Sequence, residues 1–144
     1  MHNRRKARMG FSLQNHLAAV FDGQRIRYQA QALTEDKNRP DFLFPGGREY
    51  RDERFDSSLL VMLGAKSTLK ERWRQILAEA NRIPHKHLCT LQPGISSAQT
   101  QQISDANVQL VIPQRFHETY SEQQRRSIWS VSRFVEFVRA KQRI

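Results

Sequence analysis

Residues 59–65 form a nearly continuous apolar run, Leu-Leu-Val-Met-Leu-Gly-Ala, which ends at Lys66. A run of this length without polar alternation is typical of a strand that is buried on both faces of a sheet. Directly after it, Thr68 and Glu71 match the spacing of a capping box, which predicts the start of a helix. The helix would bury one apolar stripe, formed by Leu69, Trp73, Ile76, Leu77 and Ala80.

The other segments alternate between strand and helix patterns. The predicted elements are a helix over residues 12–22, strands over 25–33, 42–44 and 59–65, a polar loop over 47–58, a helix over 69–79, a strand over 87–91, a helix over 96–107, a strand over 108–112 and a terminal helix over 122–143. Strands that alternate with helices in the second half favour an α/β fold with a partly parallel, mixed sheet. At 144 residues, we expect a single domain over residues 1–144.

The chain is strongly basic, with 24 Lys and Arg residues against 14 Asp and Glu residues and a formal net charge of +10. This balance indicates a polyanionic partner without identifying it. Residues 1–10 concentrate part of the charge in Arg4, Arg5, Lys6 and Arg8, with no periodic apolar face. Two interpretations stay open for this segment: a solvated tail, or an arm that contacts phosphates.

A single cysteine, Cys89, excludes an internal disulfide and fits a reducing cytoplasm, where we expect the protein to reside. Cys89 is expected to be a packing residue. His85 and His87 have the spacing of a metal-binding pair, but no third ligand is near them in the sequence. No apolar run approaches the roughly 18 residues that a membrane span needs, so we expect no membrane association.

Three charged residues fall on adjoining predicted elements. Asp41 begins the short strand at residues 42–44, Lys66 ends the buried strand, and Glu79 lies on the helix that follows. Two carboxylates and an ammonium so arranged can hold a divalent metal ion and prepare a water molecule to attack a phosphate. The competing interpretation is structural: Asp41 caps a turn, Lys66 extends its ammonium to solvent, and Glu79 pairs with Lys66 or Arg82.

Several sequence blocks in a fixed order decide between these interpretations. They are Arg-Pro-Asp-Phe-Leu-Phe-Pro-Gly at 39–46, Met-Leu-Gly-Ala-Lys-Ser-Thr at 62–68, Arg-Trp-Arg-Gln at 72–75, His-Leu at 87–88, Leu-Gln-Pro-Gly-Ile-Ser at 91–96 and Leu-Val-Ile-Pro at 110–113. Together with the basic segment upstream, they resemble the catalytic domain of EcoRII-type restriction endonucleases, within the PD-(D/E)xK nuclease superfamily. The resemblance implies a restriction-endonuclease-like core, a mixed central sheet flanked by helices.

In that superfamily, the usual second acid stands two residues before the lysine, where this chain has Gly64. A subgroup takes the acid from the following helix instead, and Glu79 matches that alternative. The resemblance therefore implies that Asp41 and Glu79 ligate Mg²⁺, with help from a backbone carbonyl near Ala65, and that Lys66 orients the attacking water. Tyr50 matches a tyrosine of the family that steadies the site. Relatives can carry a further acid on the first helix, where the nearest residue here is Gln14.

Lys70, Glu71 and Arg72 match a basic-acidic-basic triplet with which related enzymes read CC/GG steps. The chemistry suits this role, because Lys or Arg donates to guanine O6 and N7 while a carboxylate accepts from cytosine N4. The alternative is an ordinary exposed helix surface, with Glu71 engaged in the capping box.

The resemblance implies a Mg²⁺-dependent type II restriction-like endonuclease, a homodimer that cuts double-stranded DNA at a site such as CCWGG. Known enzymes of this type carry more chain on the N-terminal side, including a separate effector-binding domain, which we expect to be absent from residues 1–144. Two alternatives differ in function. One is a truncated DNA-binding remnant that no longer cuts, and the other is a repair nuclease of the same fold that recognises DNA structure.

Overall fold

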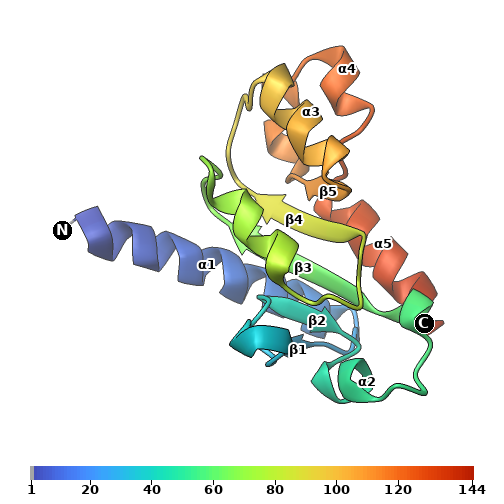
Figure 1. The fold of residues 1–144 in the computed structure, drawn as a ribbon. Helices are drawn as coiled ribbons and strands as arrows, with labels where there is room; N and C mark the ends of the chain where they lie inside the picture. The colour runs from blue at the N-terminus through green and yellow to red at the C-terminus, as the bar shows by residue number, and fades with distance from the viewer. Residues whose placement is uncertain (1) are drawn as a thin grey trace.

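The computed structural model describes residues 2–144, with side chains described from Ser12 onward. Its elements alternate around one sheet, as Figure 1 shows. In chain order they are α1 (His2–Gly23), β1 (Gln29–Ala30), η1 (Glu35–Lys37), β2 (Phe42–Phe44), α2 (Gly47–Arg51), η2 (Ser57–Leu59), β3 (Val61–Lys66), η3 (Arg72–Ala78), β4 (Lys86–Thr90), α3 (Ser97–Asp105), β5 (Val108–Val111), η4 (Gln114–Thr119), α4 (Glu122–Arg125) and α5 (Val131–Gln142), where η marks a 3₁₀ helix.

The five strands lie in the order β1-β2-β3-β4-β5. The β1–β2 and β2–β3 pairs are antiparallel, whereas β3–β4 and β4–β5 are parallel. The predicted mixed sheet is therefore confirmed, and the switch from antiparallel to parallel pairing falls on β3. Residues 61–65 of this strand are buried, as the apolar run predicted.

Each face of the sheet is covered by a separate apolar core. On one face, α1 and α5 pack against residues such as Phe42, Leu63, Ala65 and Cys89. On the other face, Met62 and Leu88 meet η3, α2 and α3, with Trp73 at 1% exposure as one of the largest buried side chains. Helices α3 and α4 lie together at the β5 end of the sheet (Figure 1). Strand β3 thus sends alternate side chains into two cores, which is why it lacks polar alternation.

Four predicted element boundaries were wrong. Helix α1 begins at His2 instead of Ser12, because the preceding residues include Arg, Lys, Ala and Met, which favour helix, and no proline. The strand expected over 25–33 is reduced to β1, and the loop expected over 47–58 contains α2 and η2. The terminal helix is divided into α4 and α5, because the backbone of Trp129 leaves the helix to bond Leu110 and Ile112 at the end of β5.

The predicted capping box is also wrong. Neither Thr68 nor Glu71 caps the next element by its side chain, and Lys70 adopts a left-handed backbone conformation at φ 40°. The chain turns there and continues as the 3₁₀ helix η3. Three residues per turn bring Trp73 and Ile76 to the same side, both buried. Leu77, which an α-helix would have buried with them, is 37% exposed.

Gly64 lets η3 lie close to β3. A Cβ atom at Gly64 would stand 2.9 Å from Cγ2 of Ile76 and 3.4 Å from Cδ1 of Leu88. Contacts of 2.9 Å between carbon atoms are too short, so any side chain here pushes η3 away from the sheet. The acid that the PD-(D/E)xK pattern places at this position is therefore sterically incompatible with the packing of η3.

We predict that Gly64→Ala lowers the free energy of unfolding by about 1–3 kcal/mol, as expected for overpacking of a core. Gly23→Ala is the matched control, because a Cβ atom there meets nothing within 4 Å. That variant should be neutral or slightly stabilising, since alanine favours a helix more than glycine does. Urea denaturation of both variants and the wild type measures the difference, and equal effects of the two substitutions would contradict the close approach of η3.

Candidate active site

Asp41 precedes β2 and is held by three hydrogen bonds from three parts of the chain. Its Oδ2 accepts from the backbone N–H of Ala65 on β3 at 2.7 Å. Its Oδ1 accepts from the side-chain amides of Gln14 on α1 at 2.9 Å and of Gln31 at 3.1 Å. With 8% exposure, this carboxylate is nearly buried. Donors from β3, α1 and the β1–η1 turn thus fix its orientation at the carboxyl end of β3.

Glu79 lies directly after η3, in an extended conformation, and is half-buried. Burial raises the pKa of this carboxyl, and the negative charge of Asp41 raises it further, while the positive charges of Lys66 and Lys86 oppose the rise. Interactions of this strength require proximity. The charges of Asp41 and Lys66 thus act on Glu79. The prediction that Glu79 lies on a helix is wrong, because this residue is extended and follows η3.

The structural interpretation of Glu79 finds no support among residues 12–144. Ion pairs within 4.0 Å in this part of the chain join only Arg54 to Asp52 and Arg126 to Glu122. Arg82 instead donates to backbone carbonyls, at 3.0 Å to Asp52 and 2.8 Å to Phe55, and to that of Tyr50. Glu79 is a carboxylate without a bonded cation.

Tyr50 is buried and lies behind the acid-bearing segment. Its hydroxyl donates to the two Glu35 oxygens at 2.6 and 2.8 Å, and it accepts from the backbone N–H of Arg82 at 3.1 Å. Burial raises the pKa of Tyr50 to about 12, and the Glu35 carboxylate contributes to the rise, so the phenol keeps its proton. Tyr50 therefore contacts the chain just after Glu79 and not the Asp41 carboxylate.

Sequence reasoning missed Gln31. It lies in a turn with a left-handed backbone at φ 56°, where no periodic pattern marks it, yet its amide bonds Asp41. Gln14 had been noted only as the residue nearest to an acid of related enzymes, and the structure places its amide on Asp41. Two neutral donors thus face the same carboxylate oxygen.

Lys70, Glu71 and Arg72 are exposed: Lys70 and Glu71 lie on the turn between β3 and η3, and Arg72 begins η3. Glu71 makes no capping bond, so its carboxylate is not engaged in the capping box that the sequence had suggested. The carbonyl of Lys70 accepts from Gln99 of α3 at 2.7 Å, which ties the turn to the body of the protein. The side chains of Arg4, Arg5 and Lys6 lie outside the described ones.

His85, His87 and Cys89 do not form a metal site. His87 is 2% exposed among Trp129, Phe134 and Phe137, and burial lowers its pKa to about 3. Cys89 is buried in the α1–α5 core, and burial raises its pKa to about 12. Within the part of the chain that the structure describes, no three His, Cys, Asp or Glu side chains gather so that they could hold a metal ion.

The donor set at Asp41 and Glu79 nevertheless fits Mg²⁺. Both groups are carboxylates, and Mg²⁺ prefers hard oxygen ligands and commonly takes only one or two carboxylates while it keeps several waters. Their mutual repulsion, which raises the pKa of Glu79, is the electrostatic condition that a divalent cation relieves. Asp41 and Glu79 are thus the residues that could hold the ion.

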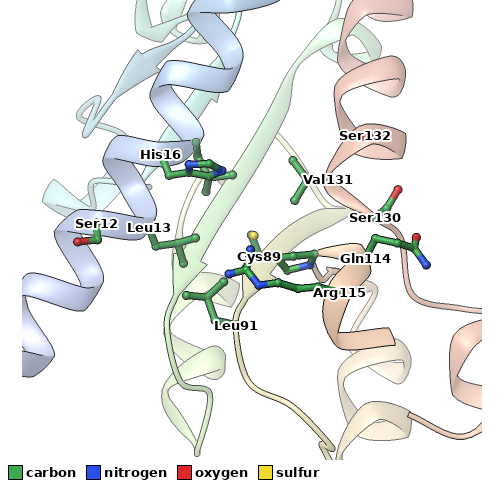
Figure 2. Close-up of a pocket in the computed structure, with 12 residues that line it drawn as sticks. Ser12, Leu13, His16, Cys89, Leu91, Gln114, Arg115, Ser130, Val131 and Ser132 are labelled. Atoms are coloured by element: carbon green, nitrogen blue, oxygen red, sulfur yellow. The ribbon is translucent and has the colours of Figure 1, made fainter. Parts of the chain in front are cut away.

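A cavity of about 430 Å³ lies elsewhere, between α1, the end of β4, the start of η4 and the start of α5. Figure 2 shows His16 facing it from α1, with Cys89 from β4, Leu91 from the residue that follows β4, and Arg115 from η4. Neither Asp41, Lys66 nor Glu79 lines this cavity. This cavity is therefore separate from the residues of the candidate acidic site.

The structure predicts opposite effects on stability for the two acids. Asp41→Ala leaves the Ala65 N–H without its acceptor and should cost about 1–3 kcal/mol, whereas Asp41→Asn keeps one acceptor and should cost less. The raised pKa means that ionised Glu79 costs stability at pH 7, so Glu79→Gln should be neutral or stabilising.

Chemical denaturation at pH 7 and below about pH 4 tests both statements. At the lower pH, Glu79 is protonated in the folded and unfolded states, so the gain from Glu79→Gln should disappear. A loss in Glu79→Gln as large as that in Asp41→Ala would mean that the Glu79 carboxylate has a structural partner.

No helix within the described residues is long and apolar enough to cross a membrane. Two solved structures share the fold over 99% of this chain: metal-depleted Ecl18kI in complex with uncleaved, modified DNA (TM-score 0.84, 22% identity) and with uncleaved DNA (TM-score 0.82, 21% identity). The match covers 48% of each of those chains. The fold is therefore the expected one, a restriction-endonuclease-like α/β core.

The sequence comparisons identify the family. The Type II restriction enzyme EcoRII of Escherichia coli is 44% identical over 134 residues, which cover 92% of this chain and 33% of that protein. The chain thus spans about a third of its curated relative. Residues 1–135 match the family described as EcoRII C terminal. This chain belongs to the EcoRII C-terminal family.

Proposed function

We propose that residues 1–144 form a catalytic domain of the PD-(D/E)xK type, a Mg²⁺-dependent type II restriction-like endonuclease that hydrolyses phosphodiester bonds in double-stranded DNA. The observation that supports the proposal is that the charges of Asp41 and Lys66 act on Glu79, while Asp41 bonds the Ala65 N–H of β3, in a member of the EcoRII C-terminal family. The similarity to Ecl18kI, solved in complexes with DNA, agrees with it.

Asp41 and Glu79 would hold the Mg²⁺ ion, which supplies Lewis-acid polarisation of the phosphate and lowers the pKa of a bound water. Asp41 is oriented for this by its bonds to Ala65 and the two glutamine amides. Lys66, half-buried at the end of β3, would donate to a phosphate oxygen and stabilise the negative charge that develops there. Tyr50 would act indirectly, by holding the segment after Glu79.

DNA recognition would come from the exposed triplet Lys70, Glu71 and Arg72. Its residues follow Lys66 closely, so a duplex bound at the acidic site would present its base edges near them. Arg4, Arg5 and Lys6 would contact phosphates. Symmetric cleavage of both strands requires two sites related by a twofold axis, which favours a homodimer, and CCWGG is the first sequence to test.

The catalytic part of the proposal predicts that Asp41→Asn, Lys66→Ala and Glu79→Gln each reduce cleavage at least about 100-fold. The reduction should be largest where a metal ligand is lost, and the variants should remain folded. Incubation with unmethylated phage DNA and Mg²⁺, followed by mapping of the cut ends, measures it. Replacement of Mg²⁺ by Ca²⁺ should permit DNA binding with little cutting, because Ca²⁺ is larger and less strict in its geometry.

Arg115→Ala provides the control, since Arg115 is exposed and lines a cavity to which neither Asp41 nor Glu79 contributes. A wild-type protein that binds DNA without cutting it would favour the non-cleaving remnant. Cleavage that depends on DNA structure and not on sequence would favour the repair nuclease. Full activity of Glu79→Gln would show that the second acid lies elsewhere.

The recognition part predicts that Arg72→Ala loses about 1–3 kcal/mol of discrimination at one base pair, while affinity for random duplex changes little. Arg74→Ala is a matched control, because Arg74 is also exposed but stacks over Trp73 at 4.6 Å from the ring centre. Binding of each variant to CCWGG and to scrambled duplexes at one salt concentration measures the difference. Equal losses on both duplexes would end the base-reading interpretation.

A further inference from the structure

The segment that carries Glu79 has almost no regular secondary structure. It leaves η3 at Ala78 and reaches β4 only at Lys86. Within it, Glu79 is extended and Ala80 has a left-handed backbone at φ 51°. Alanine rarely adopts that conformation, so surrounding contacts must hold it. An acid on a strand is fixed by the ladder of backbone bonds, whereas Glu79 depends on side chains from elsewhere.

Lys86, the first residue of β4, supplies one set of these contacts. Its side chain is 4% exposed, and its Nζ donates to the carbonyl of Ala80 at 3.2 Å and to that of Ile83 at 2.5 Å. A buried ammonium is costly unless it is well paired and bonded. Burial lowers the pKa of Lys86, and the negative charges of Glu79 and Glu35 oppose that change. The ammonium is therefore influenced by the charges of two carboxylates and bonds the backbone of the segment that carries Glu79.

Residues from the η1 region supply the second set. The Glu35 carboxylate accepts from the backbone N–H of Asn81 at 3.3 Å and from the Tyr50 hydroxyl, which itself accepts from the N–H of Arg82 at 3.1 Å. Asn38 donates to the carbonyl of Ala78 at 2.9 Å. Backbone groups on both sides of Glu79 are thus bonded by side chains of η1, α2 and β4.

We propose that Lys86 and Glu35 are positioning residues: they fix the segment 78–83 from opposite sides and so hold the Glu79 carboxylate beside Asp41. This inference rests on the proposed function, in which Glu79 is a metal ligand. Neither residue touches the reacting groups. Lys86 acts through the carbonyls of Ala80 and Ile83, and Glu35 acts through Asn81 and Tyr50.

The test compares Lys86→Met and Glu35→Gln with the control Gln124→Met. Gln124 is likewise a buried side chain that donates to a loop carbonyl, that of Ile95 at 2.8 Å, but it lies on α4. Three quantities are measured for each protein: the thermal midpoint, the hydrogen exchange of residues 78–83 without metal, and the affinity for Mn²⁺ by calorimetry. Mn²⁺ serves as the probe because it shares the preference of Mg²⁺ for oxygen ligands.

Lys86→Met should speed the exchange of residues 78–83 and weaken Mn²⁺ binding by about tenfold, as expected when support of a metal ligand is lost. Glu35→Gln should act in the same direction and keeps the test decisive if Lys86→Met fails to fold. Gln124→Met should lower the thermal midpoint while both other quantities stay at wild-type values. In a Glu79→Gln background, Lys86→Met should change Mn²⁺ affinity little further, because the positioned ligand is already absent.

The inference would be overturned if Lys86→Met and Glu35→Gln both kept the wild-type hydrogen exchange of residues 78–83 and the wild-type Mn²⁺ affinity. It would also be overturned if Gln124→Met changed these two quantities as much as they do. A wild-type protein that binds Mn²⁺ but cuts no DNA would contradict the proposed endonuclease and leave the positioning roles standing. A wild-type protein that binds no Mn²⁺ would overturn both.

Discussion

The close approach of η3 to β3 is the contact on which the proposed acidic site depends. Because Gly64 has no side chain, Ile76 packs directly on the strand, and the 3₁₀ helix lies across the sheet end. The same contact leaves no room for an acid two residues before Lys66. The chain that leaves η3 instead brings Glu79 into electrostatic reach of Asp41 and Lys66. In the proposed site, the absence of an acid on the strand and the use of Glu79 from the next segment would both follow from this packing arrangement.

The two carboxylates differ in their bonding: Asp41 accepts three hydrogen bonds, and Glu79 is half-buried without a bonded partner among the described residues. Asp41 has three donors, so it is part of the structure that joins β3, α1 and the β1–η1 turn. Glu79 has no bonded partner within the described residues, and burial and the charge of Asp41 disfavour its ionised form. Groups whose charge is costly to the folded state are common where function requires them. Asp41 is therefore fixed in the structure by its hydrogen bonds, whereas the Glu79 carboxylate stays available to bind a ligand.

Much of the fold could be predicted because its signals are local, whereas the roles of Asp41, Lys66 and Glu79 stay predictions. The apolar run at 59–65 marked β3, and Asp41 and Lys66 flank buried strands. The failures concern tertiary contacts. The capping box was overridden by burial of Leu69 and Trp73, and the terminal helix was divided by pairing of Trp129 with β5. No periodicity could reveal that Gln31 bonds Asp41 or that Tyr50 bonds Glu35 and Arg82.

An acid carried by an irregular segment needs a different kind of support from an acid carried by a strand. In β3, neighbouring strands on both sides fix the backbone at each residue. After η3, the backbone groups of Ala78, Ala80, Asn81, Arg82 and Ile83 are bonded by side chains from three other elements. Such bonds are specific to polar residues at exact distances, so they tolerate substitution less well than a ladder of backbone bonds does. An acid on this segment therefore requires buried polar side chains behind it, here Lys86 and Tyr50.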